Sequence, residues 1–371
     1  MAFLTIACPC LFGLESVLSG EIKRMGGQDV EVTDGRVCFK GTPRMIARAN
    51  VLLRTAERVL IVVGGFHAES FQELFEGVYQ LPWEHFIGRK DAFPVKGWAL
   101  NSKLHSVPDC QSIIKKAIAK RLGEHYSVSW LEESGPVHQV QFSILRNAAS
   151  IMLDTSGSGL HKRGYRPEAN AAPIKETLAA GIADLARVRE NTLLLDPFCG
   201  SGTLLIEGAT KALRIAPGLR RHFSAEHWGL IPAQDWQEER RESFEQVRRS
   251  AAFRAVGSDI DPAAVALTLA NAQRAGIRQK VSCRAEDICN FTPPQHPFVL
   301  LTNPPYGERM LTLQQAEALY RTMGQVFAPG EGRSYYIISP HEQFEHLFGR
   351  PASRRRKLYN GNIKCILYMF F

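Results

Sequence analysis

The first 64 residues alternate short apolar runs with amphipathic stretches, which is the pattern of a small α+β module. A Gly in the middle of the segment marks a tight turn between two strands. In chain order, we expect a strand Phe3–Ala7, a helix Leu11–Met25, a hairpin Val30–Phe39 turned at Asp34-Gly35, a helix Arg44–Arg54 and a strand Arg58–Val63. Residues 1–64 therefore form the first predicted domain.

Residues 65–158 mix helix and strand signals again and form a second predicted domain. The expected elements are helices Ser70–Tyr79 and Pro108–Leu122 and strands Phe93–Leu100, Val137–Arg146 and Ala149–Thr155. The second helix is amphipathic, with an apolar face and a row of cations that includes Lys116 and Lys120. A solvated helix face and a set of contacts to RNA phosphates both explain these cations, and the sequence leaves the choice open.

A Gly/Ser-rich stretch, "DTSGSGLHKRGYRP", separates these domains from residues 159–371. A helix Pro173–Leu185 follows, and then an apolar strand that ends at Asp196. A glycine turn, a further helix and a second strand come next. This order is typical of a doubly wound α/β fold with a parallel sheet, in which ligands bind at the carboxyl ends of the strands.

Composition and charge narrow the class of protein. The 371 residues are 45% hydrophobic and 22% charged, which is ordinary for a globular protein. Residues 1–160 contain 17 Lys and Arg against 16 Asp and Glu, whereas residues 161–371 contain 28 against 21. An excess of positive charge in the second part is a weak indication of an anionic partner such as nucleic acid.

The sequence also indicates a location. It has no charged-then-apolar leader and no apolar run of about 18 residues, so we expect neither a signal peptide nor a membrane span. None of the eight cysteines forms a C-x-x-C pair or a metal-ligand spacing, so we expect no metal. These features predict a cytoplasmic protein.

Carboxylates follow successive strands of the predicted sheet, at Asp196, Asp259 and Asp287. Between the first two lies "DPFCGSGT", whose Gly200 and Gly202 allow close approach of a ligand to the backbone. This is neither a G-x-G-x-x-G fingerprint nor a Walker loop. Together the carboxylates predict a nucleoside site in which Asp259 binds ribose hydroxyls, with Asp261 as its alternative. The wide spacing between Asp196 and Asp259 predicts an insertion near residues 210–250.

The stretch "LLTNPPYGERM" contains the residues that best indicate which reaction the protein catalyses. Pro304 and Pro305 end the strand before them and have no backbone N–H to donate. Asn303 and Tyr306 flank this rigid segment. A turn around a core tyrosine would explain the pattern on its own, but it is a poor explanation beside the carboxylates.

In this order, "DPFCGSGT", "GSDIDP", "AED" and "NPPYGERM" resemble a class I S-adenosylmethionine methyltransferase that acts on exocyclic amines. "LHKRGYRP" followed by "APIKETLAAG" makes the chain similar to bacterial ribosomal RNA guanine-N2 methyltransferases with a THUMP domain. The resemblance implies a ferredoxin-like module at 1–64, a THUMP-like RNA-binding domain at 65–158 and a Rossmann-like methyltransferase domain at 159–371. It also implies S-adenosyl-L-methionine as the cofactor and structured RNA as the partner, without a membrane or a metal; no protein partner can be inferred.

The resemblance further implies roles for particular residues. Asp196, Gly200 and Gly202 would lie along the methionine part of the cofactor, Asp259 at the ribose and Asp287 at the adenine. The full set that we expect to bind cofactor is Asp196, Phe198, Gly200, Gly202, Thr203, Asp259, Ile260, Asp287 and Ile288. The expected catalytic residues are Asn303, Pro304, Pro305 and Tyr306. Asn303 and the Pro304 carbonyl would orient the target amine, while Tyr306 would stack on the extruded base.

The motif fixes the chemistry better than the substrate, because adenine N6, guanine N2 and glutamine amides are all planar nitrogens. The THUMP-like region favours structured RNA, with 23S ribosomal RNA guanine N2 as the first hypothesis. The alternatives are guanine N2 of transfer RNA, adenine N6 of DNA or RNA, and a non-enzymatic ribosome assembly factor that binds RNA. The expected RNA contacts are His161, Lys162, Arg163, Tyr165, Arg166, Lys116 and Lys120. A well-packed linker is the alternative explanation for the first five.

Overall fold

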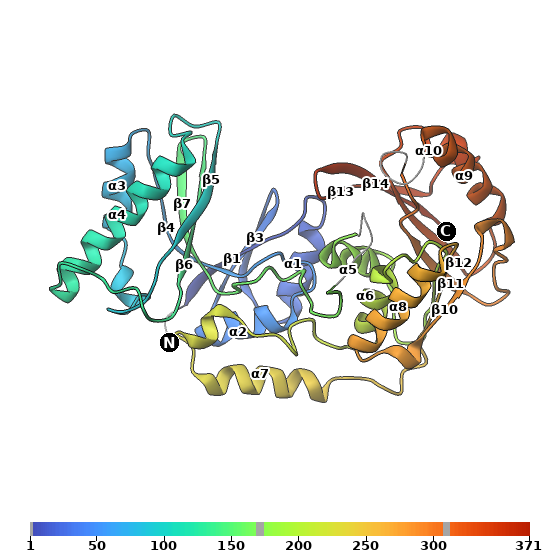
Figure 1. The fold of residues 1–371 in the computed structure, drawn as a ribbon, viewed down its shortest axis with the longest axis horizontal. Helices are drawn as coiled ribbons and strands as arrows, with labels where there is room; N and C mark the ends of the chain where they lie inside the picture. The colour runs from blue at the N-terminus through green and yellow to red at the C-terminus, as the bar shows by residue number, and fades with distance from the viewer. Residues whose placement is uncertain (1–2, 168–173, 307–311) are drawn as a thin grey trace.

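The computed structural model describes residues 3–167, 174–306 and 312–371. Its strands form two seven-stranded sheets. The first sheet and helices α3 (Phe71–Tyr79) and α4 (Val107–Tyr126) lie at one end of an elongated molecule, and the second sheet lies at the other (Figure 1). None of the described helices is long and apolar enough to cross a membrane.

The first sheet has the order β2-β3-β1-β4-β7-β6-β5 and joins both expected N-terminal domains in one layer. β4 (Leu60–His67) pairs antiparallel with β1 (Leu4–Pro9) on one side and with β7 (Ala148–Asp154) on the other. The predicted boundary between residues 64 and 65 therefore falls inside a strand that bonds to both parts. The other strands are β2 (Gln28–Thr33), β3 (Arg36–Gly41), β5 (Val95–Leu100) and β6 (Gln139–Leu145).

Local signals account for the helices of this half. Ser70 caps α3 by accepting a hydrogen bond from the Glu73 N–H at 3.2 Å. Gly35 takes φ +69° in the hairpin turn, a conformation that favours glycine. On α4, Ile114 and Leu122 are among the residues that face the core, as the amphipathic pattern predicts. The remaining elements are α1 (Glu15–Arg24), α2 (Pro43–Leu52) and the short η1 (Trp83–His85).

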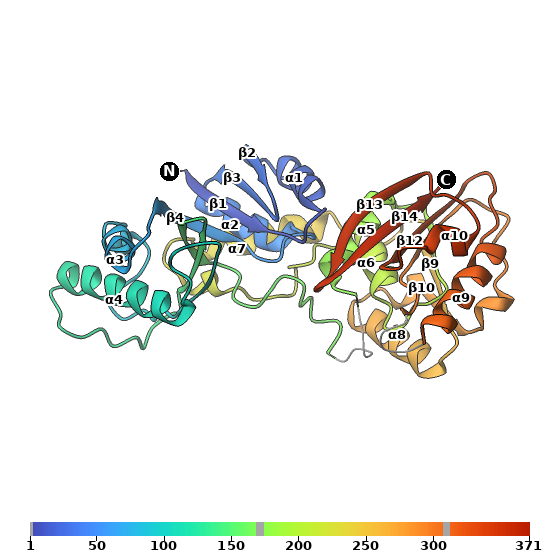
Figure 2. The ribbon, with the colours of Figure 1, turned by 90° about the horizontal axis from the view of Figure 1, so that it is seen from above.

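The second sheet has the order β10-β9-β8-β11-β12-β14-β13 and confirms the α/β fold class. β8, β9, β10, β11 and β12 run parallel, and β14 returns antiparallel against β12 and β13. Helices α5, α6 and α8 cover the face toward the first sheet, while α9 and α10 cover the other (Figure 2). Pro173, which we expected to begin α5, lies outside the described residues.

The elements of this half have the following bounds. The strands are β8 (Leu193–Asp196), β9 (Arg254–Asp259), β10 (Val281–Ala285), β11 (Phe298–Thr302), β12 (Arg333–Ser339), β13 (Arg354–Asn360) and β14 (Ile363–Phe370). The helices are α5 (Glu176–Leu185), α6 (Thr203–Ala212), α7 (Ala233–Glu245), α8 (Pro262–Arg274), α9 (Leu313–Val326) and α10 (Phe344–Phe348), with short turns η2 (Ser224–His227), η3 (Arg278–Lys280) and η4 (Ile288–Asn290).

The insertion expected near residues 210–250 is an arm, residues 216–245, that leaves the second half and packs on the first. Its Phe223 and Trp236 are buried in the core of the N-terminal half. Trp228 stacks on His138 with ring centroids 4.2 Å apart. Gly218 touches α2 so closely that an added Cβ would lie 2.5 Å from the Asn50 carbonyl oxygen. The arm therefore ties the two halves together.

Ion pairs hold α7 of the arm on α2. Glu239 is 1% exposed, and its two carboxylate oxygens accept from Nε of Arg44 at 2.6 Å and Nε of Arg48 at 2.7 Å. Glu242 accepts from the Nη2 atoms of the same arginines at 2.8 and 2.9 Å. Such fork-like guanidinium contacts fix the relative orientation of the two helices as well as their distance.

A second contact joins the halves at the start of α1. Leu14 and Val17, at the start of α1, belong to the core of the second half and not to that of the first. Arg356 of β13 donates to the Gly13 carbonyl oxygen and to the Ser16 hydroxyl, both at 2.7 Å.

Substitution of Glu239 by Gln tests the arm. The change keeps the volume but removes the charge shared by Arg44 and Arg48, so we expect the free energy of unfolding to fall by about 1–3 kcal/mol. Urea unfolding at neutral pH measures the effect. Glu245→Gln is the matched control, because Glu245 ends the same helix and is exposed. Equal unfolding midpoints for the two variants would show that the ion pairs of Glu239 do not stabilise the fold.

Candidate active site

The carboxyl ends of three neighbouring strands bring the expected site residues to one edge of the second sheet. β9, β8 and β11 are adjacent and parallel, and they end at Asp259, Asp196 and Thr302. Asn303 follows β11 directly. Residues that lie far apart in the sequence thus meet because parallel strands end at the same side of a sheet.

Asp196 is the most buried of these carboxylates, with 2% of its surface exposed. The Thr302 hydroxyl donates to Oδ1 at 2.8 Å, and the Phe198 N–H donates to the same atom at 3.2 Å. Burial, with a smaller contribution from the charge of Asp259, raises the pKa of Asp196 to about 7, although these two hydrogen bonds lower it. Both bonds fall on Oδ1, so Oδ2 is the oxygen that a ligand can use.

Asp259 joins the glycine turn to the end of β9. Its Oδ2 accepts from the Gly200 N–H at 2.9 Å, and its Oδ1 accepts from the Asp261 N–H at 3.1 Å. Gly200 adopts φ +52°, which turns its N–H toward the carboxylate. Asp261, the alternative to Asp259, caps α8 instead by accepting from the Ala263 N–H at 2.8 Å.

The glycine turn leads into α6, which begins at Thr203. Gly202 takes φ +80° at the N-cap position, and an added Cβ would meet the Thr268 side chain at 2.8 Å. Thr203 is buried, and its hydroxyl accepts from Nη1 of Arg166 at 2.7 Å. Phe198 is half-buried beside the turn. The backbone of this turn, more than its side chains, therefore faces the strand ends.

Two isoleucines lie just after strand ends: Ile260 follows β9, and Ile288 follows β10. Ile260 is 71% exposed although it directly follows Asp259, so it offers apolar surface to a ligand. Ile288 is buried in the core under β11 and α9. Asp287 caps η4, and the hydrogen bond from the Cys289 N–H at 2.8 Å lowers the pKa of its carboxyl.

The Asn303–Tyr306 segment folds back on itself. Asn303 and Pro305 are half-buried, and Pro304 is buried. The Tyr306 hydroxyl donates to Oδ1 of Asn303, and burial raises the pKa of Tyr306 well above its usual value. The ring of Tyr306 packs against the core of the second half. In the structure the Tyr306 hydroxyl bonds to the Asn303 amide, and the expected stacking of the ring on a base stays a prediction.

The basic junction after the first half is mostly internal. Arg163 is 9% exposed and donates to the Leu160 carbonyl oxygen at 2.6 Å, while Tyr165 is 6% exposed and donates to Glu207 at 3.0 Å. Arg166 donates to Thr203 and pairs with Glu176 at 3.0 Å. His161 lies 3.4 Å from Glu57, and Lys162 is exposed. A packed linker thus accounts for Arg163, Tyr165 and Arg166, whose side chains are not presented to RNA here.

The expected contacts on α4 are at the surface. Lys116 is exposed, and Lys120 is exposed with its ammonium 5.4 Å above the Tyr79 ring. Lys115, the next cation of that row, instead pairs with Glu133 at 2.5 Å and lies over Phe93. Lys120 also pairs with Glu124 at 4.0 Å, so Lys116 is the cation of this set with no ion pair among the described residues.

Sequence reasoning missed Thr302 and Glu207. Thr302 ends an apolar strand with a hydroxyl that anchors Asp196, and a polar residue at that position was a usable signal. Glu207 is buried on α6 and binds Tyr165 and Arg163, which join it from the linker. No local pattern around Glu207 indicated these partners.

The site offers a defined set of chemical groups. A buried carboxylate, a second carboxylate at the turn and an exposed isoleucine fit a ligand that carries a positive charge, hydroxyls and a flat ring. The Asn303 carboxamide adds a neutral acceptor. Within residues 3–167, 174–306 and 312–371, no cluster of three or more His, Cys, Asp or Glu could hold a metal ion.

Family models match nearly the whole chain. The RMKL-like methyltransferase domain matches residues 163–369, the RlmL ferredoxin-like domain matches residues 5–60 and the THUMP domain matches residues 68–154. The resemblance seen in the motifs is therefore confirmed at the level of the family.

Curated relatives and solved structures agree with these matches. A protein of Bacillus subtilis (strain 168) named "Putative RNA methyltransferase YpsC" is 40% identical over 99% of this chain and 96% of its own length. The ribosomal RNA large subunit methyltransferase K/L of Psychromonas ingrahamii is 32% identical over 98% of this chain, which spans 50% of that longer protein. The crystal structure of SMU.472, a methyltransferase by its assigned name that was solved with SAH, has a TM-score of 0.95 and 39% identity, covering 100% of this chain and 98% of that one.

The strand-end site, the glycine turn and the Asn303 segment thus lie within a domain that these comparisons identify, and the chain belongs to the family of RMKL-like methyltransferases with a THUMP domain.

Proposed function

We propose that this S-adenosylmethionine-dependent RNA methyltransferase modifies an exocyclic base amine, guanine N2 of 23S ribosomal RNA. The observation that carries the proposal is the position of Asn303. It follows β11 next to the strand that ends at Asp196, and its amide is oriented by the Tyr306 hydroxyl. A neutral hydrogen-bond acceptor beside the expected cofactor site suits an amine substrate, because it can accept an N–H of the amine.

The chain's own residues account for the orientation of the amine. A carboxamide oxygen has two lone pairs, so Oδ1 of Asn303 can accept from Tyr306 and from one N–H of the target. The Pro304 carbonyl would accept the second N–H. Two prolines keep this segment rigid and offer no competing N–H. The nitrogen lone pair is then directed away from the base plane, where it can react.

The cofactor is held by the strand ends and the glycine turn. S-adenosylmethionine supplies a methyl group bound to a positively charged sulfur. Asp196 would face the methionine part, and Asp259, with the Gly200 turn bonded to it, would face the ribose. Ile260 would cover one face of the adenine, which explains its exposure. Asp287 would accept from the adenine amine.

The substrate part of the proposal rests on the N-terminal half and on the relatives. A THUMP domain precedes the methyltransferase domain, and one relative is named as a large-subunit ribosomal RNA methyltransferase. This combination favours structured RNA over duplex DNA or protein, and it favours a place in the cytoplasm, where ribosomal RNA is modified. Guanine N2 of transfer RNA, adenine N6 of nucleic acid and a purely RNA-binding role remain distinct outcomes of the experiment below.

Methyl transfer from labelled S-adenosylmethionine tests the substrate. We expect label in unmodified 23S ribosomal RNA, recovered as N2-methylguanosine by nucleoside mass spectrometry, and none in transfer RNA or duplex DNA. The Asn303→Ala protein is the control for contaminating activity. N6-methyladenine, or label in transfer RNA only, would replace the substrate while keeping the amine chemistry. RNA binding without any label would favour an assembly factor.

Two substitutions separate binding from chemistry. Asp259→Ala removes a carboxylate that faces the cofactor, so we expect its dissociation constant to rise at least about tenfold. Asn303→Ala should leave that constant within about twofold and lower kcat by about 100-fold or more, because orientation of the amine is lost. Calorimetry and single-turnover transfer measure the two effects. An equal loss of cofactor binding in both variants would refute this division of roles.

The pKa of Asp196, raised to about 7, predicts a pH dependence of cofactor binding. A positively charged ligand favours the ionised carboxylate, so affinity should rise between pH 5.5 and 7.5, by up to about tenfold per pH unit below the pKa. Asp196→Asn has no charge to gain, and its weaker affinity should not change over this range. Isothermal titration of both proteins checks the slope. Parallel pH profiles would show that Asp196 is not the group that titrates.

A further inference from the structure

A basic groove lies between the arm and the far end of α8. Its volume is about 830 Å³. Among the described residues that line it, Glu207 is the one acidic side chain, and it is 1% exposed. The cationic residues that line the groove are Arg163, Arg220, Arg240, Arg241, Arg249, Arg274, Arg278 and Lys280.

Among the residues that the structure describes, most of these cations have no carboxylate partner. Arg163 is buried, and Arg240 pairs with Glu226 at 2.6 Å, so these two have structural roles. By contrast, Arg274 donates to the neutral amide of Asn271 at 3.1 Å. Arg278 and Lys280 donate to backbone carbonyl oxygens. No ion pair involves Arg220, Arg241 or Arg249 within the described part of the chain, and all three are exposed.

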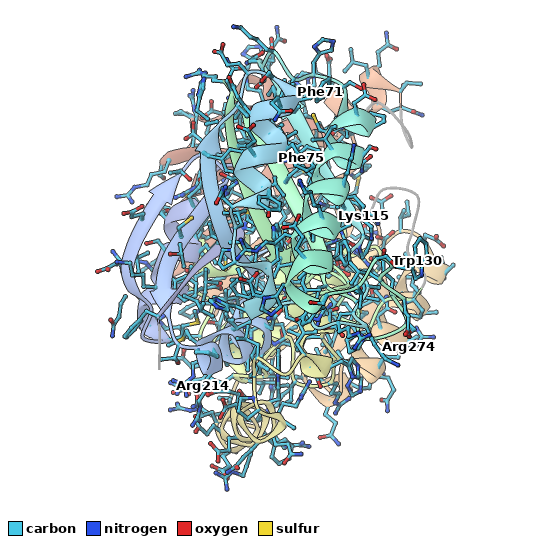
Figure 3. All side chains as sticks on the ribbon, turned by 90° about the vertical axis from the view of Figure 1, so that its left-hand side faces the viewer. Phe71, Phe75, Lys115, Trp130, Arg214 and Arg274 are labelled. Atoms are coloured by element: carbon cyan, nitrogen blue, oxygen red, sulfur yellow. The ribbon has the colours of Figure 1, made fainter. Side chains whose placement is uncertain are left out.

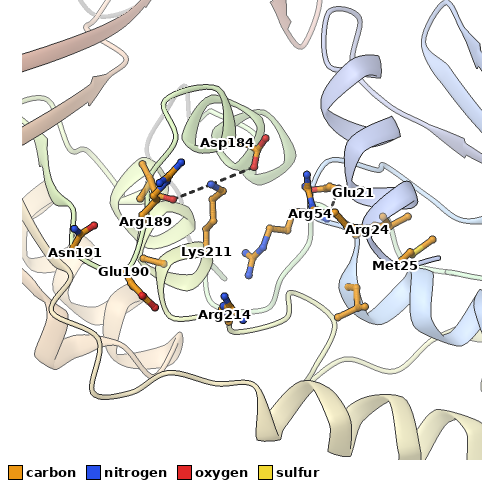
Figure 4. Close-up of a pocket in the computed structure, with 14 residues that line it drawn as sticks. Glu21, Arg24, Met25, Arg54, Asp184, Arg189, Glu190, Asn191, Lys211 and Arg214 are labelled. Atoms are coloured by element: carbon orange, nitrogen blue, oxygen red, sulfur yellow. Dashed lines mark hydrogen bonds and ion pairs between the residues drawn. The ribbon is translucent and has the colours of Figure 1, made fainter. Parts of the chain in front are cut away.

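A second cavity shows that this composition is not general for the protein. It has a volume of about 860 Å³ and lies between α1 and the α5–α6 side of the second half. Figure 4 shows Arg24 and Glu21 on one wall and Lys211 and Asp184 on the other. Lys211 pairs with Asp184 at 3.3 Å. This cavity is lined by both acidic and basic side chains, and some of them pair with each other. Its composition therefore does not favour an anionic ligand.

Clustered cations without partners repel one another, and a polyanion removes that repulsion. Phosphodiester chains do so with release of condensed counterions, which favours binding strongly at moderate salt. The groove also holds Phe244, which is 56% exposed, with the Arg249 guanidinium 5.9 Å from its ring. An exposed aromatic ring beside arginines is suited to stacking with an unpaired base.

We propose that this groove binds the backbone of the RNA substrate at a segment away from the target base; the inference rests on the proposed function and assigns it a second contact surface. The groove lies at the C-terminal end of α8, whose N-terminal end lies beside Asp259. Thirteen helical residues span about 20 Å, so the same nucleotide cannot occupy both places.

The surface continues toward the N-terminal half. Figure 3 shows Lys115 and Trp130 along the same side of the molecule as Arg274, and Figure 2 shows α4 and α8 on the same edge. Trp130 is 80% exposed on the loop that follows α4. An RNA that contacts α4 can therefore reach the groove without passing around the molecule. The occupant is then a long, folded RNA and not a short oligonucleotide.

Three substitutions test the groove. Arg220→Gln, Arg241→Gln and Arg274→Gln together remove three charges that have no ion-pair partner within the described residues. With a 23S ribosomal RNA transcript as the probe, we expect the dissociation constant to rise about 10- to 100-fold near 150 mM salt. The slope of log affinity against log salt should fall by about 2–3, as expected for three lost phosphate contacts.

The matched control removes the same charge from the other cavity. Arg24→Gln, Arg189→Gln and Arg214→Gln alter three exposed arginines of that cavity. We expect its RNA affinity to change less than threefold and its salt slope to stay unchanged. Cofactor affinity and thermal midpoint should match the unsubstituted protein in both triple variants, which shows that the fold is intact. Equal losses in both variants would mean that net charge, and not the groove, governs binding.

The outcomes separate this inference from the proposed function. If the transcript is methylated by the unsubstituted protein and the groove variant keeps full affinity and slope, the groove proposal is wrong and the function stands. If the transcript binds through the groove but receives no methyl group, the groove proposal stands and the function is wrong. If the unsubstituted protein does not bind the transcript, the groove proposal is also wrong.

Discussion

The hydrogen bond between the Thr302 hydroxyl and the Asp196 carboxylate is the interaction on which the site depends. It joins the ends of β8 and β11 in the interior, where an unpaired carboxylate would be unfavourable. Because β11 continues directly into Asn303, the same bond places Asn303 next to the end of β8. The Asp259 bond to the Gly200 N–H extends this arrangement to β9. These bonds therefore hold the ends of β8, β9 and β11 in a fixed arrangement at one edge of the sheet.

The contacts of the arm hold the two halves of the protein in a fixed position relative to each other. The arm crosses from the second half to α2, where Glu239 binds two arginines and Gly218 contacts the backbone. An RNA that contacts α4 and the strand-end site together needs this relation to be constant.

Buried charge explains why several basic residues are not available for RNA. Arg163 and Arg166 belong to a basic motif, yet they bind Glu207 and Glu176 in the interior between the linker and α6. Within the described residues, exposed cations without a carboxylate partner include Arg220, Arg241 and Arg274, which lie in the basic groove. Burial and pairing, and not the number of cations in a segment, decide which of them can meet a phosphate.

The sequence by itself determined the order of strands and helices, the glycine turn and the carboxylates after the strands, because these depend on local periodicity and on the rule that parallel strands end together. Tertiary structure alone decided that β4 serves both N-terminal parts and that Tyr306 turns toward Asn303. It also decided that Arg163 is buried and that a basic groove forms from distant segments. Those features depend on contacts between residues far apart in the chain, which no local pattern encodes.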